Sequence, residues 1–167
     1  MCNDPGARAD LRTGNRPGVL DTPWRMMPHL AKYLPRFTEQ QRIYLTVAAW
    51  YADQSPNPRT VRSAALPSAW TPGQGNIGWS LATASSRGLI NGKVTLKRLE
   101  MVTRMQTNRE AMRTNLAPLV RTLCEKNVPI FWAVLLKDLD QWRWEPTWVT
   151  KRWLDAYYDP KYHTIGK

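Results

Sequence analysis

The chain of 167 residues has 24 lysines and arginines against 13 aspartates and glutamates, a net charge of +11, and 43% of it is hydrophobic. This length suits one domain, or a small core with extended arms. Two cysteines exclude a disulfide framework, and the longest apolar runs have only about half the length of a membrane span, so we expect a protein that is not secreted and has no transmembrane segment.

Residues 1–36 are expected to form an extended N-terminal arm. They are rich in Gly, Pro, Asp and Asn and show neither a strand nor a helix period. Arg8, Arg12 and Arg16 resemble the cations of an organelle presequence, although Asp4 and Asp10 weaken that resemblance.

A helix is predicted to follow, beginning near Thr38 and ending near Asp53, because Ser-Pro comes next. Thr38 and Gln41 fit a capping box, and apolar residues recur at helical spacing at Ile43, Val47 and Trp50. Residues 55–92 are rich in turn signals, and Gly88–Thr95 is predicted to form a short β-hairpin about Asn91–Gly92.

The longest helix is predicted from Thr95 to Asn127, along an apolar stripe of Met101, Met105, Met112, Leu116, Leu119 and Leu123. Pro118 either kinks it or begins a second helix. Residues 130–139 form a buried helix or a strand, and periodicity alone leaves both open. Thr147 is expected to cap a last helix from Trp148 to Tyr158, which Pro160 ends.

The fold is therefore predicted to be mainly α, a small irregular domain of four to five helices with one possible hairpin. We expect three segments: an N-terminal arm at 1–36, a helical core at 37–140 and an aromatic-rich docking strap at 141–167.

No residues combine into a convincing catalytic, cofactor or metal site. GQGNIG at 73–78 matches a dinucleotide-binding pattern, but a Pro-containing loop precedes it where a buried strand is needed, which favours a structural turn. His29 and His163 lack metal-ligand spacing, and Cys124 lies on a predicted apolar helix. We expect a protein that is not an enzyme and has no cofactor.

The strongest functional signal is a segment rich in basic residues. Nine cations against two acids give the segment 59–113 a charge of +7. Because the arginine guanidinium group can donate two hydrogen bonds to phosphate oxygens, we predict that this segment contacts nucleic acid or another anion. The alternative is that these cations only keep the surface soluble around a packed apolar helix face. The predicted contact residues are Arg59, Arg62, Arg87, Lys93, Lys97, Arg98, Arg104, Arg109 and Arg113.

The C-terminal aromatics are predicted to bind a partner protein, because Trp and Tyr dominate interface hot spots. Base stacking and core packing are the alternatives, and Glu145, Asp155 and Asp159 among the rings disfavour stacking. The predicted docking residues are Trp142, Trp144, Trp148, Trp153, Tyr157 and Tyr158.

Taken together, this composition is typical of accessory subunits of large assemblies. The leading hypothesis is a mitochondrial ribosomal protein on the matrix side, contacting rRNA and neighbouring subunits. The second is an accessory subunit of a respiratory complex or ATP synthase, with its basic face toward acidic subunits or cardiolipin. The third is a phage or bacterial nucleic-acid-binding module, with a cytoplasmic location.

Overall fold

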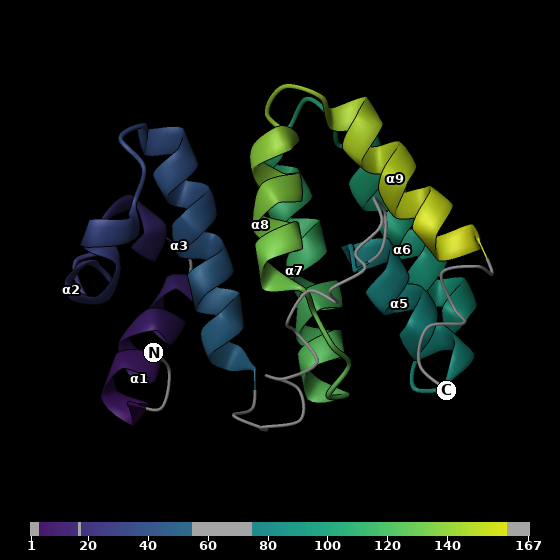
Figure 1. Cartoon of the computed structure of the whole chain (residues 1–167), viewed down its shortest axis with the longest axis horizontal. Helices are drawn as coiled ribbons and strands as arrows, with labels where there is room; N and C mark the ends of the chain where they lie inside the picture. The colour runs from purple at the N-terminus through teal and green to yellow at the C-terminus, as the bar shows by residue number, and fades with distance from the viewer. Residues whose placement is uncertain (1–3, 17, 55–74, 160–167) are drawn as a thin grey trace. The chain divides into compact units, whose positions relative to one another are not determined.

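The computed structural model describes residues 4–16, 18–54 and 75–159, and in these ranges it is helical and contains no strand (Figure 1). The mainly-α prediction is confirmed. Four to five helices was too few, since the described ranges hold eight α-helices. No described helix is long and apolar enough to cross a bilayer.

The chain divides into two compact units, Met1–Pro56 and Asn57–Lys167, which we describe separately. The assignment of separate roles to residues 1–36, 37–140 and 141–167 stays a prediction.

The N-terminal unit contains α1 (Pro5–Arg12), η1 (Thr13–Asn15), η2 (Val19–Asp21), α2 (Met27–Leu30), η3 (Ala31–Tyr33) and α3 (Thr38–Asp53). Its core is a cluster in which Leu11 and Met26 pack with Leu45, Ala49 and Ala52 of α3. The short helices before residue 36 correct the expectation of an irregular arm. Helices of three to eight residues are too short to establish a periodic pattern, which is why the sequence did not reveal them.

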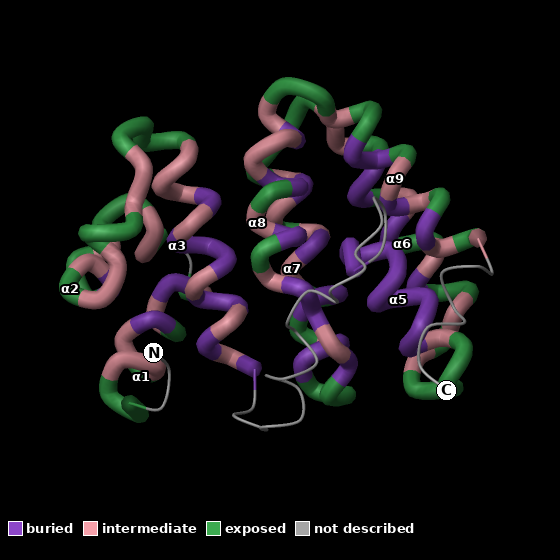
Figure 2. The backbone as a smooth tube through the Cα atoms, viewed as in Figure 1, coloured by how far each residue is buried: buried purple, intermediate pink, exposed green. Residues whose placement is uncertain are grey.

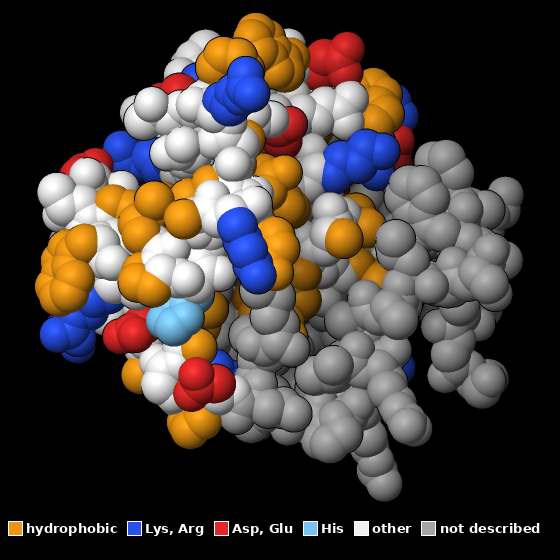
Figure 3. Space-filling view, turned by 60° about the vertical axis from the view of Figure 1, so that its left-hand side comes forward, with side chains coloured by type: hydrophobic (Ala, Val, Ile, Leu, Met, Phe, Trp, Pro, Cys, Tyr) orange, Lys and Arg blue, Asp and Glu red, His pale blue; other side chains and the backbone are white. Residues whose placement is uncertain are grey.

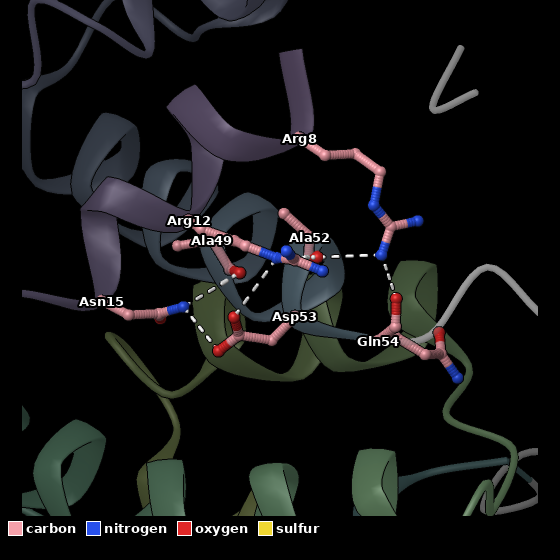
Figure 4. Close-up of polar contacts among 7 residues, drawn as sticks. All are labelled: Arg8, Arg12, Asn15, Ala49, Ala52, Asp53 and Gln54. Carbon is pink, nitrogen blue, oxygen red and sulfur yellow. Dashed lines mark hydrogen bonds and ion pairs between the residues drawn. The ribbon is translucent and has the colours of Figure 1, made fainter. Parts of the chain in front are cut away.

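Side chains of α1 and η1 bind the C-terminal end of α3 (Figure 4). Arg8 and Arg12 both donate to the Ala52 carbonyl, at 2.9 and 2.8 Å, and Arg8 also donates to the Gln54 carbonyl. Asn15 donates to the Ala49 carbonyl at 3.2 Å. The last carbonyls of a helix lack intrahelical partners and carry a partial negative charge, so these cations satisfy them and tie the segment to α3.

The predicted end of α3 at Asp53 is confirmed, but its predicted capping box is wrong. The N-cap residue is Phe37, which offers no side-chain bond, and the Gln41 amide donates instead to the Pro35 carbonyl at 2.9 Å.

The C-terminal unit contains α5 (Ile77–Ser86), α6 (Gly92–Arg104), α7 (Arg109–Glu125), α8 (Trp132–Gln141) and α9 (Pro146–Tyr158). Helix α9 packs along α5 and also contacts α6 and α8, while α6 packs on α7 (Figure 1). Almost the whole of α5 is buried (Figure 2). The ambiguous segment 130–139 is mostly helix, since α8 begins at Trp132.

The glycine-rich motif serves the packing of α5 against α9. Gly75 turns the chain at φ 74°. The Asn76 side chain then accepts from the Trp79 amide at 3.0 Å and donates to the Arg152 carbonyl at 3.1 Å. At Gly78, an added Cβ would lie 1.9 Å from the Trp153 carbonyl oxygen. The motif therefore forms the N-terminal end of α5 and allows α9 to pack closely against it. Gly73, the first residue of the motif, lies outside the described residues.

Two local predictions in this unit are wrong, and one of the two alternatives for Pro118 is excluded. Asn91–Gly92 forms no hairpin, because Asn91 caps α6 by accepting from the Val94 amide at 3.2 Å. The single long helix is broken after Arg104, where Asn108 caps α7 by accepting from the Ala111 amide at 2.9 Å. Pro118 lies within α7 and does not begin a new helix.

The last helix begins one residue before Thr147, at Pro146, whose missing N–H costs nothing in a first turn. The Thr147 hydroxyl contacts the Gln106 side chain at 3.1 Å and does not cap α9. Pro160 lies outside the described residues.

Candidate interaction surfaces

The basic residues predicted to bind phosphate cluster mainly on α6 and at the start of α7. Lys93, Lys97, Arg98 and Arg104 are exposed on α6, and Arg87 is exposed just after α5. Arg59 and Arg62 lie outside the described residues.

Three of the α6 cations share one face. Lys93, Lys97 and Arg104 fall within about 40° on a helical wheel, which makes them neighbours along the exposed side of the helix. We call them the α6 basic stripe. Glu100 falls on the same face, but it is half-buried and accepts from the Tyr158 hydroxyl at 3.4 Å. Within the described part of the chain no acid forms an ion pair with the stripe.

The two predicted contact residues on α7 already have partners inside the fold. Arg113 pairs with Glu110 at 2.5 Å, and its side chain is only 12% exposed. Arg109 donates to the Arg143 carbonyl at 3.4 Å. On the face drawn in Figure 3, Lys and Arg side chains lie singly between apolar and acidic ones. Because Arg109 and Arg113 already have partners in the fold, the exposed cations of α6 are the better candidates for a compact basic site.

The C-terminal aromatics divide into core and surface residues. Trp142 and Trp153 are 1% and 0% exposed and pack with ring centres 5.1 Å apart. The Tyr157 hydroxyl donates to the Gly92 carbonyl at 3.0 Å. These three side chains hold the fold together, which leaves Trp144, Trp148 and Tyr158 exposed for a partner.

Trp144 and Trp148 form an aromatic surface at the turn from α8 into α9. They are 75% and 45% exposed. Each ring has a guanidinium over one face, Arg143 at 5.1 Å from Trp144 and Arg152 at 4.3 Å from Trp148. Such cation–π contacts orient the rings and leave their other faces open to a partner.

A buried carboxylate, which sequence reasoning did not single out, joins α8 to α9. Asp138 is 0% exposed, and its Oδ2 accepts from the Trp153 indole at 2.7 Å while its Oδ1 lies 3.2 Å from Arg152. Burial raises the pKa of Asp138, while the Trp153 hydrogen bond and the Arg152 charge act in the opposite direction. Its partners are 14 and 15 positions away, a spacing with no recognisable sequence signal.

The described residues assemble no metal cluster. His29 lies 3.1 Å from Asp10 in the N-terminal unit, and Cys124 is buried on α7. His163 lies outside the described residues.

A model of the family of CRISPR-associated protein Cse2 matches residues 7–158. A chain of a solved "CRISPR RNA-guided surveillance complex" is 30% identical, with a TM-score of 0.72 over 96% of this chain and 84% of that one. A second, from such a complex in a pre-nicking state, is 29% identical, with a TM-score of 0.74 over 96% and 85%.

The crystal structure of M. ruber CasB matches at 20% identity and a TM-score of 0.66, over 93% of this chain and 85% of that one, which supports the fold alone. No curated protein matches the chain.

These matches contradict the functions predicted from the sequence. The assignment to a mitochondrial ribosome and the alternative of a respiratory or ATP synthase subunit were wrong. The third alternative, a phage or bacterial nucleic-acid-binding module, did not identify a CRISPR-associated protein. The matches also give no support to rRNA or cardiolipin as partners. The error has a physical cause. A basic surface and exposed aromatic side chains are expected of a subunit that contacts any nucleic acid, so they do not identify one particular complex.

Proposed function

Because the chain belongs to the family of CRISPR-associated protein Cse2, we propose that it is a structural, non-catalytic subunit of a CRISPR RNA-guided surveillance complex. The observation that carries this proposal is the 30% identity, over 96% of the chain, to a chain of such a complex. In this role the protein contacts other protein subunits and nucleic acid. A cytoplasmic location follows from the role.

Nucleic-acid contact is assigned first to the α6 basic stripe. Its three cations are exposed, lie on one helix face and have no acidic partner among the described residues, so phosphates can approach them without displacing an ion pair. Arg87, Arg98, Arg59 and Arg62 extend the proposed set. Arg109 and Arg113 contribute less, since both already hold partners within the fold.

Contact with another subunit is assigned to Trp144 and Trp148. Large rings held by neighbouring guanidiniums lose little conformational entropy on binding, which suits them to anchor a protein interface. Tyr158, 58% exposed, is a further candidate.

The decisive test is reconstitution. The full chain is co-expressed with the other subunits of the same organism's complex and its guide RNA, and the particle is analysed by size-exclusion chromatography and native mass spectrometry. We expect the particle to contain this chain. A particle that forms fully without taking it up refutes the proposal.

A further inference from the structure

An apolar pocket of about 250 Å³ lies where α5 ends, α6 begins and α7 ends. Its floor includes the buried Leu81 and Leu119. Its rim includes Leu89 and Val94, which are 38% and 47% exposed. Apolar side chains that are partly exposed around a concavity can be covered by an apolar group of another molecule, which would remove them from water.

The chain turn after α5 builds this rim. Gly88 takes φ 68°, and the Leu89 amide donates to the Ala84 carbonyl at 3.0 Å. This bond pattern is that of a Schellman ending, in which the apolar residue after the glycine usually packs back on its own helix. Here Leu89 remains on the pocket rim and is partly exposed.

Two cations, Arg98 and Lys126, also line the pocket, and both are exposed. No acidic residue is among the lining residues, and in the described ranges neither cation forms an ion pair. An apolar hole with two available cations at its edge is complementary to an apolar group flanked by carboxylates, since charge-assisted hydrogen bonds would form around the buried group.

The size and walls of the pocket restrict the occupant. The volume is below the roughly 300–1,000 Å³ of pockets that enclose a drug-sized ligand, but it suits a single anchoring side chain. Its walls contain leucine, isoleucine and valine and no aromatic ring, so a nucleic-acid base would find nothing to stack on.

We propose that this pocket binds a segment of a partner protein that inserts one apolar side chain between acidic residues. No residue of the α6 basic stripe, and neither Trp144 nor Trp148, lines the pocket, which shares only Arg98 with the wider set of cations proposed above to contact nucleic acid. The proposal does not depend on the role in a surveillance complex.

The test uses the full-length protein with ¹³C-labelled leucine and valine methyl groups. The probe is an acetylated, amidated heptapeptide with one leucine between two runs of three glutamates. We expect saturable NMR shifts of the Leu81, Leu89, Val94 and Leu119 methyls. The same peptide with serine for leucine should shift none of them, and the peptide with lysines for glutamates should bind at least about tenfold more weakly, which corresponds to about 1.4 kcal/mol.

Variants locate the site. Leu89→Glu with Val94→Glu should weaken peptide binding at least about tenfold, by placing carboxylates where the acidic peptide must approach. Arg98→Glu with Lys126→Glu should do the same. Met101→Glu is the matched control: it adds a carboxylate at a 50% exposed apolar position on α6 outside the pocket lining, and should bind the peptide as the native protein does.

Several results would overturn the proposal. These are no methyl shift with the leucine–glutamate peptide, equal binding of the lysine peptide, or equal weakening by Met101→Glu. Shifts of the pocket methyls on raising the protein concentration alone would show that a second copy fills the pocket. Stronger shifts with a single-stranded oligonucleotide would identify a nucleic-acid site. None of these outcomes bears on whether the chain enters the particle, so the two proposals can fail independently.

Discussion

At the scale of single residues, the contact between α9 and its neighbours depends on Asp138 and Gly78. Asp138 is a buried acceptor that orients Trp153 and Arg152, and Gly78 lets the backbone of α9 approach α5. Removing the charge of Asp138 or adding a methyl group at Gly78 therefore has a specific expected effect.

Asp138→Asn is expected to remove a pH-dependent contribution to stability. Because the folded-state pKa of Asp138 is raised above its ordinary value of 3.8, folding favours the protonated form. The contribution of this group is complete below pH 3.8 and is lost as pH rises through the folded pKa. The free energy of unfolding of the native protein minus that of Asp138→Asn should therefore fall from pH 4 to pH 7.

Urea denaturation at each pH measures this difference. Asp140→Asn, which removes a partly exposed carboxylate on the same helix, is the control. A difference that grows with pH would mean that the ion pair with Arg152 outweighs the burial of the carboxylate.

Gly78→Ala is expected to destabilise the C-terminal unit by about 1–3 kcal/mol or more, the usual cost of overpacking. The new methyl would lie 1.9 Å from the Trp153 carbonyl oxygen, a backbone atom that cannot rotate away. Gly6→Ala in α1 is the control, since its added Cβ would meet only the Asp4 oxygen at 3.2 Å. Thermal unfolding of both variants decides the matter, and a Gly78→Ala protein as stable as the native one would contradict the helix contact described above.

At the scale of elements, the sequence predicted those that have strong boundary signals. Helix α3 ends where Ser-Pro follows, as expected. The break between α6 and α7 was missed because Met101, Met105 and Met112 stay in helical phase across it, and periodicity cannot report an interruption that preserves the phase. Asn91–Gly92 was misread because asparagine favours both a hairpin turn and a helix N-cap.

The candidate surfaces were predictable only in part for a related reason. Spacing along the predicted helix places Lys97 and Arg104 on one face, but Lys93 fell in the predicted hairpin, so the full α6 basic stripe was not found from the sequence. Spacing does not tell which aromatic rings meet a distant helix. Trp153 and Trp144 each follow an arginine, yet one is fully buried and the other is 75% exposed.

Reversal of the α6 basic stripe, Lys93→Glu, Lys97→Glu and Arg104→Glu, is expected to weaken binding of a fluorescein-labelled single-stranded oligonucleotide, irrespective of its sequence. The slope of log K against log salt should flatten by about two units, because each single-strand phosphate contact contributes about 0.7. Fluorescence anisotropy across a salt series measures both effects.

The control for this variant is Lys32→Glu with Arg36→Glu and Arg121→Glu, which makes the same change in net charge at exposed cations elsewhere in the chain. Equal weakening by the control would show that only overall charge matters. A salt slope near zero for the native protein would remove the α6 basic stripe from consideration.

Trp144→Ala with Trp148→Ala is expected to leave the fold intact, since both rings are exposed, and to lower the affinity for the remaining particle at least about tenfold, as loss of hot-spot residues does. Pull-down of the labelled chain with the purified particle measures it. Trp24→Ala, at a 69% exposed ring in the N-terminal unit, is the matched control. Retention of full affinity by the double variant would rule out this surface as the docking site.

At the scale of the whole molecule, part of the positive charge is used within the fold. Arg8 and Arg12 bind carbonyls at the end of α3, and Arg42 pairs with Asp21 at 3.1 Å. The net charge of +11 therefore overstates the number of cations available to a partner. Which particle the protein enters could not be derived from charge, because every phosphate backbone attracts it alike.

Truncation after Asp140 is expected to unfold the C-terminal unit. It removes Trp142, Trp153 and all of α9, and so exposes the α5 surface around Gly78. Circular dichroism should show loss of a cooperative melting transition. Truncation after Asp159, which keeps α9, is the control and should preserve the transition. If the product ending at Asp140 folds cooperatively, α9 is not part of the core and acts as a docking strap.

The contacts between α1 and the end of α3 also set an order of events during synthesis. The carbonyls that Arg8 and Arg12 bind lie 40 to 46 positions downstream, so α1 leaves the ribosome well before its partners do. At about 5–20 residues per second this interval lasts about 2–9 s. An isolated helix of eight residues is marginal in water, so we expect α1 to form only when the end of α3 has emerged. The first helix of the nascent chain is then among the last in its unit to fold.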